Sequence, residues 1–525
     1  MIIRILEGHY TVKSQIKIGS VLSYLQMFLS IVIELAYTPI MMRLLGKSEF
    51  GLYNTASSTI AMLSVLNLGF SAGYIRYYAK YKHNNDEISI AKLNGLFLSI
   101  FSIIGLVAFG CGLYISNNLE IVFANGLTAS EIQLAKKLMI ILTVNLAISF
   151  PMSVFSIIIS AHEEFIFLKV AGMLRTICGP LITLPLLLMG YRSIVMVSVT
   201  TIVLVTTDII CMLFVVRKLH EKFIFSHWDW FLVKGLMVYT GFIAINIVVD
   251  QINSNIDNIL LARFKGASEV AVYAAGSRLY TAYVRFSTAI SGMFVPRIHF
   301  IANSTKDKNE LNKMYTEVFI KVGRVQFAIL GLIATGLIFF GRQFILYWAG
   351  DGYENSFYVT LLLVLPASIA LIQNIGIEIQ RAENKHQFRS IAYLMMALIN
   401  FIISLYLCQR LGAVGSTIGT AISLIIANGV IMNIFYYKRC YINIPLFWKN
   451  ILSMSKGMIL PVLIGILYSL WSYQRINIVT FALAIMIYTI IYSISMWKFS
   501  LNEEEKKLVL GPSKRIIKIL KGEYK

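Results

Sequence analysis

Charged residues are scarce in this sequence, and acidic residues are the scarcer kind. Of the 525 residues only 14% are charged, and 26 acidic residues stand against 46 lysines and arginines. Soluble domains contain about 25% charged and about 45–50% apolar residues, whereas this chain is 58% hydrophobic. The composition excludes a chain of one or two soluble domains and indicates an integral membrane protein.

Cysteines are also few, and they are widely separated. None stands in a C-x-x-C or other paired spacing. Disulfide frameworks and zinc sites need such pairs, so neither is expected. Isolated cysteines behave as small apolar packing residues, and this role is predicted for Cys111, Cys178, Cys211, Cys408 and Cys440.

Long apolar runs dominate the sequence. A bilayer core is crossed by about 20 mostly apolar residues, and this template predicts an all-α, polytopic fold with about fourteen transmembrane helices. The first run is too long for a signal-peptide core and lacks a cleavage site after it, so it is predicted to remain as a span. The predicted ranges are 18–42, 52–79, 93–116, 137–160, 165–189, 193–216, 231–262, 269–296, 321–347, 357–379, 388–409, 412–437, 454–473 and 476–497.

Lysines and arginines gather in the segments on one side of these spans. By the positive-inside rule this side is the cytoplasm, and an even number of spans places both termini there. In a soluble protein the net charge of +20 would suggest nucleic-acid binding, but orientation explains it here and no nucleic-acid partner is expected. The basic tail is predicted to form an amphipathic helix on anionic lipid, through Lys514, Arg515, Lys518 and Lys521.

Signals for enzymatic chemistry are missing. The sequence contains no Walker A, G-x-S-x-G or H-E-x-x-H pattern and no paired Cys/His metal motif. The longest outer loop covers only 117–136, whereas a membrane glycosyltransferase or polymerase needs a larger extramembrane part to hold its acceptor and metal. The sequence therefore predicts no enzyme, no cofactor and no metal site.

Two hairpins of the sequence repeat at a fixed offset. RLLGKSEFGLY (43–53) matches RFKGASEVAVY (263–273) without gaps, with identical Arg, Gly, Ser, Glu and Tyr. Six spans separate the copies, so the repeat is parallel and predicts two six-helix lobes, 1–222 and 223–440. Two further spans in 441–500 and a basic cytoplasmic tail in 501–525 follow. Local helix capping explains the Gly and the Ser-Glu, but not the recurring Arg and Tyr.

The first hairpin lies in a stretch that resembles a known family. Residues 38–78 contain RLLGKSEFGLY, then L-G-F and the pair Arg76-Tyr77, and 257–296 contains D-N-I-L-L, the second hairpin and a closing V-P. These features resemble bacterial polysaccharide-export proteins, the oligosaccharide (O-antigen) flippases of the multidrug/oligosaccharidyl-lipid/polysaccharide exporter superfamily. Similarity to lipid II flippases and multidrug extruders is more remote.

The resemblance implies a function, a location and partners. It implies transport of a polyprenyl-diphosphate-linked oligosaccharide across the bacterial cytoplasmic (inner) membrane, for lipopolysaccharide O-antigen or capsule-type polysaccharide. Membrane lipid, a coupling ion (proton or sodium), and polysaccharide polymerase and chain-length proteins are the further partners it suggests. The alternatives are a cation-coupled multidrug extruder of the same superfamily and a membrane polysaccharide polymerase.

Polar residues follow one face of two predicted spans. The spacings of 4, 3 and 4 in the seventh span confine its polar residues to a ~60° arc, and the 220-residue offset places them on the face equivalent to a polar face of the first span. Intramembrane acids are costly unless paired or hydrated, so a shared polar cavity is predicted, with a dry interface between packed helices as the alternative. The residues are Asn246, Asp250, Asn253 and Asp257, and Ser23, Gln26, Ser30, Glu34 and Tyr37.

Two arginines lie one heptad apart in the eighth span. Equal distances from the hairpin turn place Arg278 level with Asp250, so that these two can neutralise each other, and Arg285 level with Asn246. Arg285 is therefore the predicted diphosphate contact, since a guanidinium fork bridges two phosphate oxygens. The alternative is that Arg285 snorkels or pairs with another acid such as Asp208.

The remaining assignments are weaker. Arg76 either guides a headgroup or is a positive-inside anchor, and Asn246 and Asn253 join the predicted substrate-binding set. Glu378 and Arg381 are predicted to form a local ion pair. The four acids predicted to line the cavity or couple an ion are Glu34, Asp208, Asp250 and Asp257; the histidines of the inner loops, His162, His220, His227 and His386, receive no role.

Overall fold

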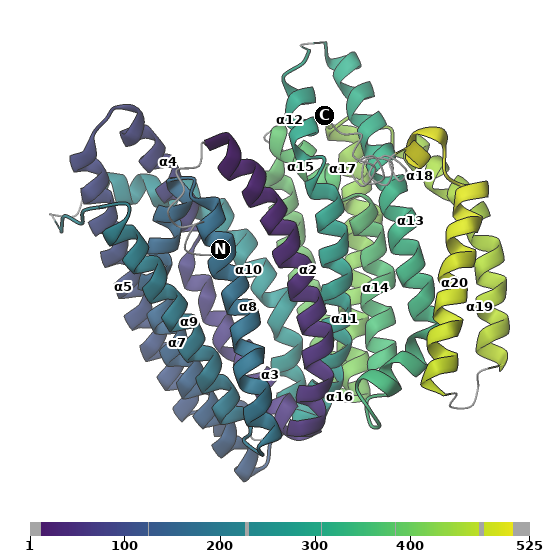
Figure 1. The fold of residues 1–525 in the computed structure, drawn as a ribbon, viewed down its shortest axis with the longest axis horizontal. Helices are drawn as coiled ribbons and strands as arrows, with labels where there is room; N and C mark the ends of the chain where they lie inside the picture. Colours follow the sequence, from purple (N-terminus) through teal and green to yellow (C-terminus); the bar gives the residue numbers. More distant parts are fainter. Residues whose placement is uncertain are drawn as a thin grey trace, which may run out of the picture. The chain divides into compact units, whose positions relative to one another are not determined.

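A computed structural model of the chain describes residues 12–123, 125–225, 230–305, 307–383, 385–471 and 477–507. These residues are helical nearly throughout and contain no strand (Figure 1). The predicted tail helix, with Lys514, Arg515, Lys518 and Lys521, lies outside the described residues. So does His227.

Within the described residues, every predicted span coincides with one helix or with two or three consecutive helical segments, and the predicted spans 388–409 and 412–437 share one helix. In the first half these are α2 (Val12–Leu45), α3 (Lys47–Ala61) with η1 (Met62–Asn67) and α4 (Phe70–His83), α5 (Glu87–Asn117), α6 (Leu119–Phe123), α7 (Ala129–Ala161), α8 (Phe165–Leu188) and α9 (Ser193–Arg217). The second half contains α10 (Trp230–Phe264), α11 (Ala267–Gly292), α12 (Val295–Ala302), α13 (Lys308–Trp348), α14 (Ser356–Ile372), α15 (Ile375–Ala382), α16 (His386–Leu424), η2 (Ile425–Ile431), α17 (Met432–Arg439), α18 (Ile444–Ser453), η3 (Met454–Met458), α19 (Ile459–Trp471) and α20 (Ile478–Phe499).

The protein is an all-α, polytopic membrane protein. Ten described helical segments, or eleven when the bent pair α14 and α15 counts as one span, are long and apolar enough to cross a membrane. Helices α10 and α11 are outside this set, and the segment Gln387–Arg439 combines two predicted spans. The count of fourteen therefore fits approximately and stays a prediction.

Helix α16 is interrupted where the sequence predicts the end of one span and the start of the next. Gly412 has φ 60° and ψ −136°, which breaks the helix between two straight parts. A positive φ of this kind is accessible to glycine without strain. The break leaves the backbone N–H of Ala413 free to bond elsewhere.

The chain divides into two compact units. One comprises the described parts of 1–279 and 390–420, and the other those of 280–389 and 421–525. In the first unit α2 packs on α8, α5 on α7, α7 on α9, and α10 on α3; in the second α13 packs on α14, α18, α19 and α20. The units divide the chain at places other than the predicted lobe boundaries, which remain predictions.

Aromatic side chains fix the last two spans to α13 within the second unit. Phe340 of α13 stacks on Tyr468 of α19 at 4.3 Å between ring centroids and meets the edge of Tyr488 of α20 at 5.2 Å. Phe481 adds a further contact from α20. Such pairs contribute about 0.5–1.5 kcal/mol each beyond the area they bury, so α19 and α20 are held as a pair against α13.

The repeated hairpins are equivalent in three dimensions. Glu49 accepts a hydrogen bond at 2.9 Å from the backbone N–H of Ser193, 144 residues further along the chain. Glu269, its repeat equivalent, accepts one at 2.9 Å from the N–H of Ala413, again 144 residues further along. Both acids therefore bind the first turn of a helix other than their own, where exposed N–H groups and the helix dipole favour a carboxylate.

The structure also explains why the glycine and the tyrosine recur in both hairpins. Gly46 and Gly266 adopt φ of 79° and 89° at the turns, which explains glycine at both. Tyr273 donates to Asp257 at 2.8 Å, and its equivalent Tyr53 lies close to Tyr37, the residue 220 positions before Asp257. The recurring tyrosine thus returns to the preceding helix of its own hairpin in both copies.

Candidate functional site

An ion pair within the predicted membrane spans joins α2 to α11. Arg278 Nη1 donates to Glu34 Oε1 at 3.0 Å, and the two side chains are 30% and 13% exposed. The predicted partner of Arg278 was Asp250, and that pairing remains a prediction. Glu34 lies 244 residues from Arg278, on a helix that the argument from the hairpin turn does not include.

The polar face of α10 is accessible along part of its length. Asp250 is exposed and Asn246 and Asn253 are half-buried, whereas Val249 is buried. Val248 and Ile252, on other faces of α10, are half-buried as well, so the one-sided polar face stays a prediction. Arg285 is half-buried on α11, and the structure does not test its predicted contact with a ligand. The same holds for Arg76, exposed in the middle of α4.

The prediction that Asp257 faces water is wrong. Its residue is 0% exposed, and its carboxylate accepts hydrogen bonds from Tyr273 at 2.8 Å, from Thr420 at 3.3 Å and from Ser416. The part of α16 that follows the Gly412 break brings Ser416 and Thr420, one helical turn apart, onto the same carboxylate. Around Asp257 the polar face of α10 therefore forms a dry interface with a packed helix, which was the alternative to the predicted cavity.

Cysteine labelling separates the two parts of the α10 face. In a cysteine-free background, a cysteine at 250 should react with a small hydrophilic maleimide, because Asp250 is exposed, and one at 257 should not, because Asp257 is fully buried. Mass shift of the intact protein measures the reaction. Equal labelling at both positions in folded protein would contradict this description of α10.

A second intramembrane ion pair joins α8 to α9. Arg175 Nη2 donates to Asp208 Oδ1, and the side chains are 34% and 7% exposed. Asp208 is thus a buried counter-ion of Arg175, and its role in lining the cavity or coupling an ion remains a prediction. The predicted set omits Arg175, although an arginine in the middle of an apolar run is itself a signal of function.

A hydrogen-bonded network lies where α4, α5 and α7 meet the segment after α9. His162 Nε2 contacts Glu221 Oε1 at 2.9 Å and the Tyr78 hydroxyl at 3.0 Å. Asn94 donates to the other oxygen of Glu221 at 2.7 Å and accepts from Tyr74 at 2.6 Å. Burial raises the pKa of Glu221, but the hydrogen bonds from His162 and Asn94 outweigh it, so this pKa lies below its ordinary value. No sequence motif marks this network, because its members come from four separate segments.

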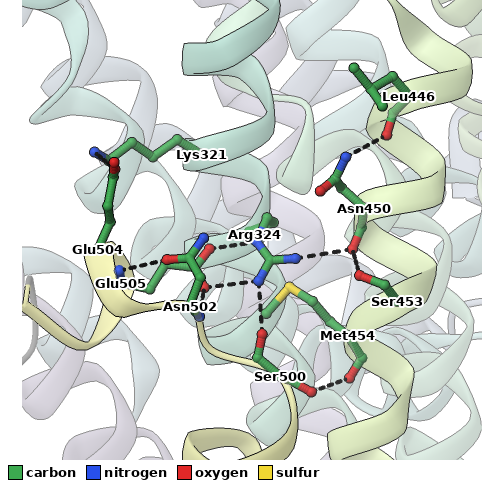
Figure 2. Close-up of polar contacts among 10 residues, drawn as sticks. All are labelled: Lys321, Arg324, Leu446, Asn450, Ser453, Met454, Ser500, Asn502, Glu504 and Glu505. Atoms are coloured by element: carbon green, nitrogen blue, oxygen red, sulfur yellow. Dashed lines mark hydrogen bonds and ion pairs between the residues drawn. The ribbon is translucent and has the colours of Figure 1, made fainter.

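A pocket of about 480 Å³ lies in the second unit, beside a buried arginine. Figure 2 shows that every nitrogen of the Arg324 guanidinium has a partner: Nε donates to Glu505 at 2.5 Å, Nη1 to the Asn450 carbonyl at 3.3 Å, and Nη2 to Glu505 at 2.9 Å and the Ser500 carbonyl at 2.8 Å. Arg324 and Glu505 are 7% and 3% exposed. The arrangement connects α13, α18 and the segment after α20, so it is a structural clamp.

The charges around this pocket balance one another. Lys321 donates to Glu504 at 2.7 Å, which lowers the pKa of the Glu504 carboxyl, and Arg297 and Glu317 line the same pocket. An anionic ligand would meet as many acids as bases here, so the pocket is a weaker candidate than the intramembrane arginines.

At the edge of α15, Arg381 donates to Glu378 at 2.7 Å, which confirms the predicted local ion pair. Among the described side chains no three of His, Cys, Asp and Glu are placed to share a metal ion.

Comparisons with known proteins agree with this architecture. Residues 18–302 match the family model described as "Polysaccharide biosynthesis protein". No curated protein matches the chain. Among solved structures, the lipid II flippase MurJ in an inward closed conformation is similar with a TM-score of 0.68 at 17% identity, covering 91% of this chain and 97% of that one.

Multidrug transporters share the fold as well. An inward-facing MATE family transporter of the MOP superfamily has a TM-score of 0.58 at 14% identity, covering 80% of this chain and 99% of that one. The MATE multidrug transporter DinF-BH has a TM-score of 0.58 at 14% identity, covering 81% of this chain and 96% of that one. The family model covers more than half of the sequence, and the chain therefore belongs to the polysaccharide biosynthesis protein family, with a fold shared by membrane flippases and multidrug transporters.

Proposed function

We propose that this protein is a flippase that moves a polyprenyl-diphosphate-linked oligosaccharide repeat unit across the bacterial cytoplasmic membrane, for assembly of a surface polysaccharide such as O-antigen or capsule. The family match supports a role in polysaccharide biosynthesis. The fold shared with a lipid II flippase supports transport of a lipid-linked ligand by a protein that performs no chemistry on it.

The observation that carries the proposal is the ion pair of Glu34 and Arg278. A charge at the centre of a membrane helix costs about 2.5–3.5 kcal/mol on insertion scales, so two charges on separate helices indicate a polar ligand. Arg278 keeps 30% of its side chain exposed while bound to Glu34. A guanidinium donates to two oxygens at once, which suits a diphosphate, and Arg285 follows one heptad later on α11.

We assign the coupling ion, a proton or sodium, to the buried cluster at Asp257. Asn400 Oδ1 accepts from Ser404 at 3.0 Å and from Thr420 at 3.3 Å, so that amide, hydroxyl and carboxylate oxygens gather around one acid. Hard cations prefer such oxygen ligands, and a carboxylate can also carry a proton. Glu34 and Asp250 are the other proposed acids of the transport path.

The proposed orientation places both termini in the cytoplasm. The excess of lysine and arginine on that side supports it, and the basic residues at the cytoplasmic ends of the helices meet anionic lipid headgroups there. Polysaccharide polymerase and chain-length proteins are the proposed partners, because they use the saccharide once it reaches the outer leaflet.

Deletion of the gene tests the function directly. Lipid-linked oligosaccharide should accumulate several-fold and remain inaccessible to an impermeant saccharide-oxidising reagent added to spheroplasts, while surface polysaccharide disappears. Wild type and Arg217→Gln, a change at an exposed residue at the end of α9, should both restore export. Unchanged levels of lipid-linked saccharide, together with intracellular retention of cationic dyes, would instead establish a multidrug extruder. Imposed sodium or proton gradients in the same cells identify the coupling ion.

A further inference from the structure

Arg175 occupies the middle of a membrane-spanning helix, and its side chain is partly exposed. It is the eleventh residue of α8, which covers Phe165–Leu188, so it lies about 15 Å along the helix axis from the first residue. A third of its side chain, 34%, is exposed. Charged residues in such positions either pair fully or mark the path of a polar ligand.

The guanidinium of Arg175 is only partly used. Nη2 donates to Asp208, and across the described part of the chain Nε and Nη1 of Arg175 have no protein partner. Arg324 is the useful comparison, because all three of its nitrogens are occupied and it is 7% exposed (Figure 2). A guanidinium offers five N–H donors. Most of those of Arg175 are therefore available, whereas Arg324 uses four of its five and cannot offer two to a ligand.

Asp208 holds this guanidinium in place. Its side chain is 7% exposed, and it projects from α9, which packs against α8. The two side chains of this pair differ in burial: Asp208 is enclosed by protein, whereas part of the Arg175 guanidinium is exposed. Asp208 is therefore the residue that holds the other in position. In the absence of a ligand Asp208 neutralises Arg175, and it does so through one donor nitrogen.

The register of α2 and α8 places Arg175 beside the polar face of α2. Three contacts share one offset of 146 residues: a Cβ on Gly19 would meet Phe165, a Cβ on Gly172 would overlap the Gln26 amide, and Tyr37 shares a hydrogen bond with Thr183. The helices are therefore parallel.

This register gives the relative positions, along the axis of α2, of Arg175 in one intramembrane ion pair and Glu34 in the other. Arg175 lies level with position 29 of α2, between Gln26 and Ser30, and Glu34 lies five residues further along, about 7.5 Å higher on the axis. A Cβ built on Gly179, one turn beyond Arg175 on the same side of α8, would meet no heavy atom within 4 Å. Space thus exists on α8 one turn beyond Arg175, close to the level of Glu34.

We propose that Arg175, held by Asp208, forms a second anion site that binds the phosphate oxygens of the lipid-linked diphosphate, at a different height from Arg278. This inference rests on the proposed function. The ligand takes the donors that Asp208 leaves unused, so no charge has to be separated before binding. Two cations at different heights, with Arg278 held by Glu34 about 7.5 Å further along α2, let the diphosphate pass from one site to the next while it remains neutralised.

The test measures binding of farnesyl diphosphate to the purified full chain, with thermal stability recorded in parallel. Arg175→Gln should raise the Kd at least tenfold. Because this change also leaves Asp208 uncompensated, the decisive variant is Arg175→Gln with Asp208→Asn, which restores neutrality. We expect that double variant to melt like wild type and still to bind at least tenfold more weakly, whereas Asp208→Asn alone should bind as tightly as wild type or more so.

The outcomes distinguish this inference from the proposed function. If the double variant regains both stability and wild-type binding, Arg175 is only the structural partner of Asp208 and the second site is refuted, while the flippase proposal stands. If the wild-type protein does not bind farnesyl diphosphate, the diphosphate-binding function and the second site fail together. Arg217→Gln, exposed and outside both pairs, is the matched control and should bind as wild type.

Discussion

Replacing Arg324 by methionine should remove most of the folded protein from the membrane. The substitution leaves Glu505 buried, with 3% of its surface exposed and its charge uncompensated, and removes the two carbonyl contacts to Asn450 and Ser500. Breaking one side of a buried pair costs about 3–5 kcal/mol, a large part of a typical stability of about 5–15 kcal/mol. The amount of monodisperse protein extracted from membranes, and its melting temperature, measure the effect.

The double variant provides the control for this prediction. Arg324→Met combined with Glu505→Met removes both charges and should be less harmful than the single change, because no uncompensated charge remains. Arg297→Met, at an exposed residue of the same pocket, should change stability by about 0.5 kcal/mol or less. Wild-type abundance of the Arg324→Met protein would show that the clamp does not hold α18 and α20 to α13.

Charge reversal at Arg285 should abolish export while protein abundance stays near normal. A phosphate site loses its attraction and gains repulsion on this change, and we expect at least a tenfold fall in the rate of export, about 1.4 kcal/mol or more. Arg285→Lys should rescue only partly, since an ammonium cannot form a bidentate fork. Surface polysaccharide and accumulated lipid-linked saccharide are the readouts, in cells with matched amounts of protein.

Arg278 provides the contrast with Arg285. Arg278→Glu places two carboxylates side by side at Glu34, so it should lower abundance as well as export, and Glu34→Gln with Arg278→Gln should recover abundance better than either change alone. Normal export by Arg285→Glu protein would mean that the headgroup is bound elsewhere, and Arg76 would be the next residue to test.

Features that depend on one helix at a time could be predicted from the sequence. Apolar runs located the helices, although α7 and α13 begin 8 and 13 residues before the predicted spans and α3, η1 and α4 together form one predicted span. The spacing of residues in α10 placed its polar residues on one predicted face. The same spacing could not separate Asp250, which is exposed, from Asp257, which is buried. That difference is caused by Ser416 and Thr420, about 160 residues away, and periodicity within α10 contains no information about them.

Pairings between distant helices were the main omission. Counting residues from the hairpin turn between the two helices pairs Arg278 with Asp250 of α10. Such counting can relate only consecutive helices. The partner that the structure adds, Glu34, belongs to the first span. The predicted set lacks Arg175 and gives His162 no role for a related reason. Their partners, Asp208 and Glu221, lie on other segments of the chain.

The repeated acids also constrain the order in which the chain can be completed. Glu49 is synthesised 144 residues before Ser193, and Glu269 the same number before Ala413, which at about 5–20 residues per second is a delay of about 7–30 s. During that interval each carboxylate has left the ribosome without the helix start that it caps. Each of these two contacts can therefore form only after the start of the sixth span of its repeat has been made, and truncation just before Ser193 or Ala413 should yield a chain that quality-control proteases recognise as unfinished.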